Sequence, residues 1–116
     1  MSVPTSAKFV IKRHARRPYL RLLVKDSSGD PFDFTGAVDV KFVMKDEDDV
    51  LKIDAVATIE SPPTTGVLRY EWAAGDTDTS GEFHAEFDVN YGAGEILTIP
   101  LDGDLLVRIY EDVNNA

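Results

Sequence analysis

The chain has 116 residues, with 12 Lys or Arg and 21 Asp or Glu, which gives a net charge of −9. We expect a single domain spanning residues 1–116, because this length supports one core but not two. The absence of cysteine excludes disulfides and cysteine-bound metals. No apolar run approaches the ~18 residues of a membrane helix, so no membrane partner is expected. The start, MSVPTSAKF, lacks the apolar region of a secretory signal.

Charge is distributed unevenly along the chain. Residues 1–25 contain seven cations and no acid, whereas residues 26–116 contain five cations and 21 acids, so the two parts carry +7 and −16. An acidic body repels phosphate, which argues against a nucleic-acid partner. The segment KRHARRPYLR at 12–21, here called the basic strip, has one tyrosine and lacks the interleaved aromatic residues of single-strand binders.

Apolar and polar residues alternate with period 2 along most of the chain, which is typical of strands with one buried face. About eight strands are predicted, at 8–13, 19–25, 37–45, 50–60, 67–72, 82–91, 95–100 and 104–111. Between them, the segments SPPTTG (61–66) and AAGDTDTSG (73–81) predict loops. The spacing of roughly 8–12 residues per strand, with no repeat and no amphipathic helix, indicates an all-β antiparallel sandwich or small barrel.

The same alternation predicts which side chains form the core. The inward positions are Phe9, Ile11, Val38, Val40, Phe42, Met44, Leu68, Tyr70, Trp72, Phe83, Ala85, Phe87 and Val89. Trp72 allows a second interpretation, because with Tyr70 and Tyr91 it could form an aromatic platform that binds a carbohydrate. A core position is favoured, since Trp72 shares a face with Leu68.

Sites for chemistry are weakly indicated. His14 and His84 lack a third ligand at a recognisable spacing. The acidic runs at 46–49 and 102–104 lack the ligand alternation of a dedicated calcium loop, and Asp-Gly is ordinary turn chemistry. No nucleophile elbow, phosphate loop or zinc-protease helix is present. We therefore expect no catalytic residue, no metal and no cofactor, and a protein that is not an enzyme.

Two segments together resemble the immunoglobulin-like N-terminal domain of phage baseplate upper proteins, which also occurs in small virion proteins. The first is DSSGDPFDFTGAVDVKFVMK, in which the matching residues are Asp26, Gly29, Pro31, Phe34, Thr35, Gly36, Ala37, Val40, Phe42 and Met44. The second is GDTDTSGEFHAEFDVNYGAGEILTIP, at residues 75–100. The matching residues are Gly66 and Trp72, which precede this segment, and within it Asp76, Thr77, Gly81, Phe83, Glu86, Phe87, Thr98 and Pro100. The resemblance covers roughly residues 8–110.

This resemblance implies an immunoglobulin-like β-sandwich that acts as a structural protein of a tailed-phage virion. It would be assembled in the host cytoplasm into a tail, baseplate or head–tail junction, as an adaptor or decoration. Other phage structural proteins, or further copies in a homo-oligomer, would be its partners. Because the chain stops at Ala116, we do not expect it to carry the receptor-binding half of the larger family members.

The expected interaction residues are four arginines of the basic strip, Arg13, Arg16, Arg17 and Arg21. Two interpretations of them remain open. They could dock onto an acidic neighbour, or they could be neutralised by carboxylates of their own fold. It is equally open whether the sandwich is completed by its own first strand or by a strand of a neighbour.

One corner of the sandwich also remains open. Many immunoglobulin-type sandwiches have a tyrosine near the start of the strand that corresponds to 82–91, and its hydroxyl bonds back to the preceding loop. Phe83 has no hydroxyl. Either Asp76 and Asp78 brace the loop by accepting bonds from backbone N–H groups, or the corner is looser.

Overall fold

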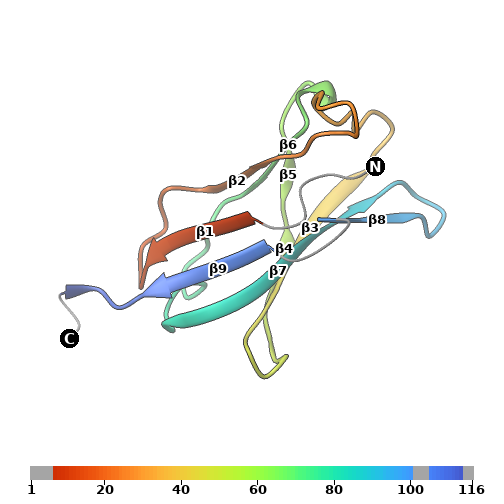
Figure 1. Ribbon diagram of the computed structural model, residues 1–116. Coiled ribbons are helices and arrows are strands. Elements are labelled where there is room, and N and C mark those ends of the chain that lie inside the picture. The colour runs from red at the N-terminus through yellow and green to blue at the C-terminus, as the bar shows by residue number, and fades with distance from the viewer. Residues whose placement is uncertain (1–6, 101–104, 114–116) are drawn as a thin grey trace.

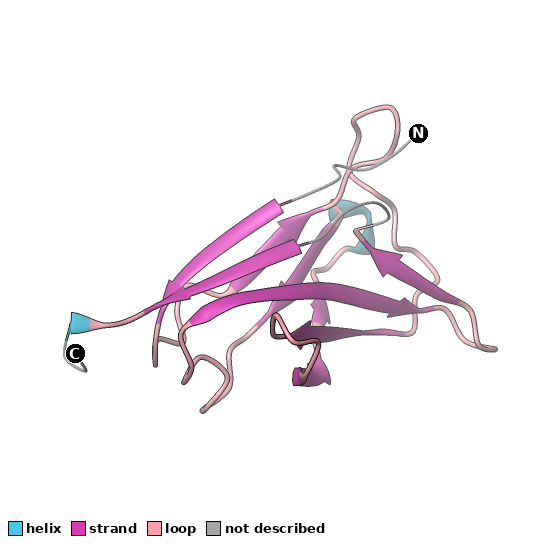
Figure 2. Ribbon diagram, turned by 60° about the horizontal axis from the view of Figure 1, so that its bottom comes forward, coloured by secondary structure: helices cyan, strands magenta, loops and turns pink. Residues whose placement is uncertain are grey.

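A computed structural model describes residues 7–100 and 105–113. Within them the chain forms nine strands and one short 3-10 helix, arranged as two facing sheets (Figure 1 and Figure 2). The larger sheet contains β1 (Ala7–Lys12), β3 (Asp39–Lys45), β4 (Leu51–Val56), β7 (Gly81–Asn90), β8 (Ile96–Ile99) and β9 (Leu105–Tyr110). The smaller sheet contains β2 (Leu20–Leu23), β5 (Thr58–Ile59) and β6 (Val67–Tyr70), and the helix is η1 (Pro63–Thr65). The predicted all-β sandwich is confirmed.

The order of strands is β1-β9-β7-β3-β4 in the larger sheet, where β8 also pairs with β7, and β2-β6-β5 in the smaller one. All pairs are antiparallel except β1–β9, which is parallel, with Ala7 opposite Leu105. The sequence predicts only antiparallel pairing, because alternation encodes the buried face of a strand but not the direction of a distant partner. This edge of the sheet is formed by the chain's own first strand.

The predicted strand at 50–60 is two strands. β4 pairs with β3 in the larger sheet, and β5 pairs with β6 in the smaller one. The chain crosses between the sheets at Ala57, whose N–H donates to the Val40 carbonyl at 2.8 Å. Alternation continues through the crossing, so the pattern alone does not reveal it. Within the described residues no helix is long and apolar enough to cross a membrane.

Aromatic rings fill the centre of the core. The ring of Phe42 stacks on Tyr70 with centroids 4.5 Å apart, lies 5.1 Å from Phe87, and meets Trp72 edge-on at 5.8 Å. Trp72 is 2% exposed, so its predicted core position is confirmed and the carbohydrate platform is wrong. The other predicted inward residues are buried or pack against the core, with one exception. Val38 is 66% exposed, because β3 begins one residue after it, at the open end of the sandwich.

The turn that leads into β3 is built as predicted around Thr35 and Gly36. Gly36 has φ +95°, a conformation that favours glycine. The Asp33 carboxylate accepts hydrogen bonds from the Thr35 N–H and hydroxyl, which hold the pKa of Asp33 below its usual value. The Ala37 N–H then donates to the Phe34 carbonyl at 3.0 Å. Local side-chain bonds thus define the entry into the core strand.

Gly66 lies so close to the backbone of two neighbouring segments that no side chain fits there unless that backbone shifts. It has φ +74°, and a Cβ built on it would lie 2.8 Å from both the Phe32 nitrogen and the Val24 carbonyl oxygen. Gly29 has a similar φ of +86°, but a Cβ there would meet nothing within 4 Å. Substitutions at these two glycines therefore distinguish the cost of backbone strain, which both share, from the cost of steric overlap, which only Gly66 has.

We predict that Gly66→Ala destabilises the fold more than Gly29→Ala. Left-handed strain at either position costs about 1–3 kcal/mol, and only at Gly66 does the new methyl group also displace backbone. Urea unfolding of both variants measures the difference. Equal losses of unfolding free energy would show that the Val24–Phe32 backbone moves aside without cost.

Candidate protein-docking site

The four arginines of the basic strip divide into two groups in the structure. Arg21 donates two hydrogen bonds of 2.7 Å to the Glu60 carboxylate, and Arg13 lies 3.3 Å from Glu111. These two are neutralised within the fold. Arg16 and Arg17 form no ion pair with any residue in the described part of the chain.

Arg16 and Arg17 are nevertheless held in place. The Arg16 Nε donates to the Trp72 carbonyl at 3.0 Å. The Arg17 guanidinium lies over the Tyr19 ring, 5.2 Å from its centroid, and its Nη2 is 3.4 Å from the Tyr19 hydroxyl. We call Arg16, Arg17 and Tyr19 the arginine corner. A hollow of about 640 Å³ lies beside it, with Glu71 on its wall.

The segment that carries the arginine corner is tied to the core and to the loop that follows β6. The Trp72 indole N–H donates to the Pro18 carbonyl at 3.2 Å. The Thr77 hydroxyl donates to the Ala15 carbonyl at 2.8 Å, and the His14 N–H donates to the Thr77 carbonyl at 3.0 Å. Thr77 is buried, which is unusual for a polar loop residue. These bonds give a connection without regular structure a defined shape.

The loop after β6 is braced by Tyr70 of β6, a tyrosine that the sequence analysis does not single out for this role. The Tyr70 hydroxyl donates to the Asp76 carboxylate at 2.5 Å, and the same Asp76 oxygen accepts the Ala73 N–H at 2.7 Å. Of the two alternatives that the sequence left open, bracing through a backbone N–H group is seen for Asp76. Asp78 instead pairs with Lys52, which holds the pKa of Asp78 below its usual value. Burial, and then the hydrogen bond to Asp76, raise the pKa of Tyr70.

A network of charged side chains covers the outer face of the smaller sheet. Glu60 accepts hydrogen bonds from Arg21 and, at 3.3 Å, from Arg69, which also lies 3.0 Å from Glu71. The bonds from Arg21 hold the pKa of the Glu60 carboxyl below its usual range. No sequence pattern indicates this network, because 39 residues separate Arg21 from Glu60 and only the β2-β6-β5 pairing brings them together.

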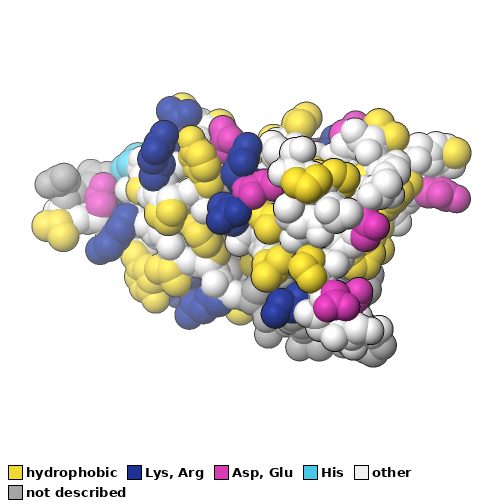
Figure 3. Space-filling model, turned by 90° about the horizontal axis from the view of Figure 1, so that it is seen from above, with side chains coloured by type: hydrophobic (Ala, Val, Ile, Leu, Met, Phe, Trp, Pro, Cys, Tyr) yellow, Lys and Arg dark blue, Asp and Glu magenta, His cyan; other side chains and the backbone are white. Residues whose placement is uncertain are grey.

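Lys and Arg side chains gather on one part of this surface. Figure 3 looks down on the side where β2 and β6 lie in Figure 1, and most basic groups lie on its left half, with some acidic groups among them, while the right half shows more acidic than basic groups. The separation of charge along the sequence is therefore kept only in part on this face, because acidic side chains lie among the basic ones.

The other predicted sites are placed as follows. His14 lies in the connection after β1, and His84 lies on the outer face of β7. In the acidic run 46–49, Asp46 accepts the N–H groups of Asp48 and Val50 at 2.9 Å, which is turn chemistry. The run 102–104 lies outside the described residues. Among the residues that the structure describes, no three His, Cys, Asp or Glu side chains form a group that could hold a metal ion.

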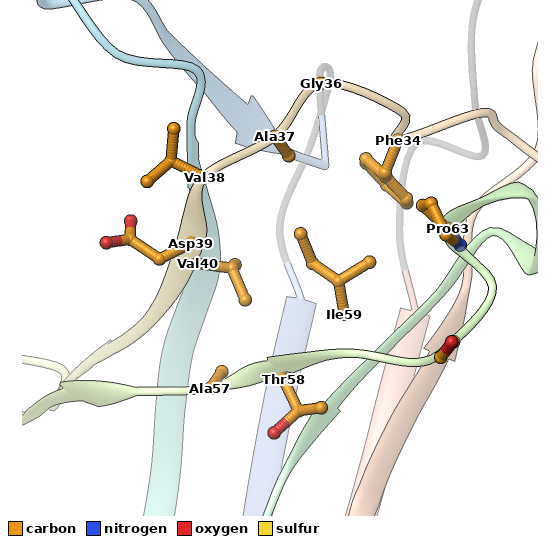
Figure 4. Close-up of a pocket in the computed structure, with 11 residues that line it drawn as sticks. Phe34, Gly36, Ala37, Val38, Asp39, Val40, Ala57, Thr58, Ile59 and Pro63 are labelled. Carbon is orange, nitrogen blue, oxygen red and sulfur yellow. The ribbon is translucent and has the colours of Figure 1, made fainter.

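A second concave region lies at the other end of the sandwich. Figure 4 shows an apolar groove of about 390 Å³ between the start of β3 and β5, with Phe34, Val40 and Ile59 directed into it. Asp39 is also on its border, but its carboxylate points away, across β3. Among the described residues that line it, Asp39 is the only charged one.

We predict that Tyr70→Phe lowers the unfolding free energy at neutral pH by about 1.5–3 kcal/mol, the usual value of a hydrogen bond to a charged group. The folded-state pKa of Tyr70 is raised above the unfolded value of about 10. Its contribution is therefore complete below pH 10 and declines as the pH rises further, because unfolding then releases a proton.

The difference between wild type and Tyr70→Phe should consequently shrink above about pH 10. Denaturant unfolding at neutral and alkaline pH measures it. Tyr110→Phe, at an exposed position on β9, is the control and should show no such trend. A difference that stays constant across this range would contradict the proposed coupling.

Comparison with known proteins agrees with the family that the sequence motifs resemble. The family model of the BppU N-terminal domain matches residues 22–101, which is more than half of the chain. The crystal structure of CopC from Methylosinus trichosporium OB3b is similar in fold, with a TM-score of 0.52, 14% identity, and coverage of 96% of this chain and 91% of that one. No curated protein sequence matches. The chain belongs to the family of baseplate upper protein (BppU) N-terminal domains, which are structural domains of phage baseplates.

Proposed function

We propose that the protein is a non-enzymatic adaptor or decoration of a tailed-phage virion and that it binds another structural protein through its arginine corner. One observation carries the proposal. Arg16 and Arg17 are fixed at the surface without an ion-pair partner among the described residues, while Arg13 and Arg21 are paired with carboxylates of the fold.

Physical chemistry favours this corner as a contact. Arginine and tyrosine are enriched among the residues that dominate binding energy at protein interfaces. Arg16 has already lost part of its side-chain freedom through the bond to Trp72, so docking would cost less conformational entropy. The two Nη atoms of a guanidinium match the two oxygens of a carboxylate. An acidic protein surface is therefore the partner that the corner fits.

The location in the virion can be tested directly. Purified particles of the phage that carries the gene should contain the chain at a fixed ratio to the known tail proteins, as measured by quantitative mass spectrometry. Absence from intact, infectious particles would overturn the proposal.

We predict that Arg16→Ala together with Arg17→Ala weakens binding to the virion partner and reduces its salt dependence. Truncation of a central arginine in a desolvated pair costs about 2–5 kcal/mol of binding free energy. Titration calorimetry against the partner that co-purifies from particles measures this loss.

A matched control removes two cations elsewhere. Lys41→Ala with Arg108→Ala changes the net charge equally, and both side chains are already paired on the larger sheet, with Asp54 and Glu82. The control should bind like wild type. Equal weakening by both double variants would show that net charge, rather than the arginine corner, drives docking.

A further inference from the structure

We infer that the acidic surface that receives the arginine corner is the opposite end of a second copy of this chain. The contact would be heterologous, with the arginine corner of one copy on the acidic end of the next. This inference rests on the docking role proposed above and adds the identity of a partner. The acidic end is defined by Asp26, Asp30, Asp33, Asp39 and Glu95.

The strand register places the start of the basic strip and the acidic end at opposite ends of the sandwich. Lys12, at the end of β1, is opposite Tyr110, and Ile109 is opposite Gly81, the first residue of β7. Asp39 is opposite Asn90, the last residue of β7. The ten residues of β7 span about 30 Å at roughly 3.3 Å per residue. One copy therefore cannot bring its own corner onto its own acidic end.

The acidic end has carboxylates available for a partner. Asp26 and Asp33 accept hydrogen bonds within their own turns. Within the described residues, Asp30, Asp39 and Glu95 have no ion-pair or side-chain hydrogen-bond partner. Lys25 is the one cation in the described loops at this end, so the potential there is negative.

The acidic end also offers apolar surface next to its charges. The groove of Figure 4 has Asp39 on its border, with the carboxylate directed outward, and Val38 is exposed beside it. The arginine corner combines two guanidinium groups with the ring of Tyr19. An apolar centre with charges around it is the usual arrangement of a protein interface. The arginine corner itself, rather than the whole end that also carries the acidic hairpin 46–49, is thus complementary to the acidic end in charge and polarity.

Size predicts a weak contact. The two shorter extents of the molecule are 27 and 26 Å, so the cross-section at one end is at most about 700 Å². This limit is slightly below the ~800 Å² that each partner buries in a standard interface. Self-association should accordingly depend on protein concentration and on salt.

The test is sedimentation velocity over a series of protein concentrations at about 0.1 M and about 1 M salt, between which the screening length falls from about 10 to about 3 Å. Wild type should associate at the lower salt and dissociate at the higher one. Arg16→Glu with Arg17→Glu, and separately Asp30→Lys with Asp39→Lys, should each weaken association by about tenfold or more. An equimolar mixture of the two variants should restore it, because each supplies the surface that the other has lost.

Glu47→Lys with Asp48→Lys is the matched control. It makes the same charge change as Asp30→Lys with Asp39→Lys, but on the hairpin between β3 and β4, at the end where the basic strip lies. This variant should associate like wild type. Loss of association in it, or failure of the mixture to associate, would overturn the inference.

The inference and the proposed function fail differently. A wild-type chain that remains monomeric at every concentration overturns self-docking, while binding of another virion protein by the arginine corner stands. If the wild type self-associates through the arginine corner but Arg16→Glu/Arg17→Glu still binds the other virion protein normally, the proposed function is overturned instead. Circular dichroism of each variant verifies its fold, and restoration in the mixture requires both variants to be folded.

Discussion

The aromatic contact between Phe42 of the larger sheet and Tyr70 and Trp72 of the β6 segment is the interaction on which the rest of the structure depends. It joins the two sheets at their centre, and removal of a ring of this size from a core typically costs about 3–5 kcal/mol. Tyr70 and Trp72 are buried, and their polar atoms bond the segments that cover them. The Tyr70 hydroxyl holds the Asp76 loop, and Trp72 bonds both Pro18 and Arg16. Core packing therefore orients the candidate docking site.

Ion pairs within the fold divide the charged side chains into two groups. Some are neutralised by a neighbour in the same chain, and others remain available to bind a partner. Glu60 accepts hydrogen bonds from Arg21 and Arg69 on the smaller sheet. Exposed ion pairs of this kind contribute little to stability, but they remove their members from competition for a partner. Arg16 bonds only a backbone carbonyl among the described residues and so retains its full charge at the surface.

Local patterns predicted much of this fold. The alternation in 82–91 is strict, and all four residues it assigns to the core are buried in β7. The turn at Thr35 and Gly36 follows from the conformational freedom of glycine and the carboxylate of Asp33. Val38 was misplaced because alternation continues past the end of the strand. The division of 50–60 between two sheets was missed for the same reason, since a crossing leaves the pattern unchanged.

By itself, the sequence determined the fold class, the inward face of most strands, the family motifs and the polarity of charge, because each depends on near neighbours in the chain. Only the tertiary structure decided the parallel β1–β9 pair, the bond between Tyr70 and Asp76, and which arginines are neutralised. Each of these joins residues whose meeting depends on how sheets and loops pack. Arg16 and Arg21 cannot be distinguished by their sequence context. The pairing of β2, β6 and β5 places Glu60 beside Arg21, whereas Arg16 bonds the Trp72 carbonyl and stays exposed to solvent.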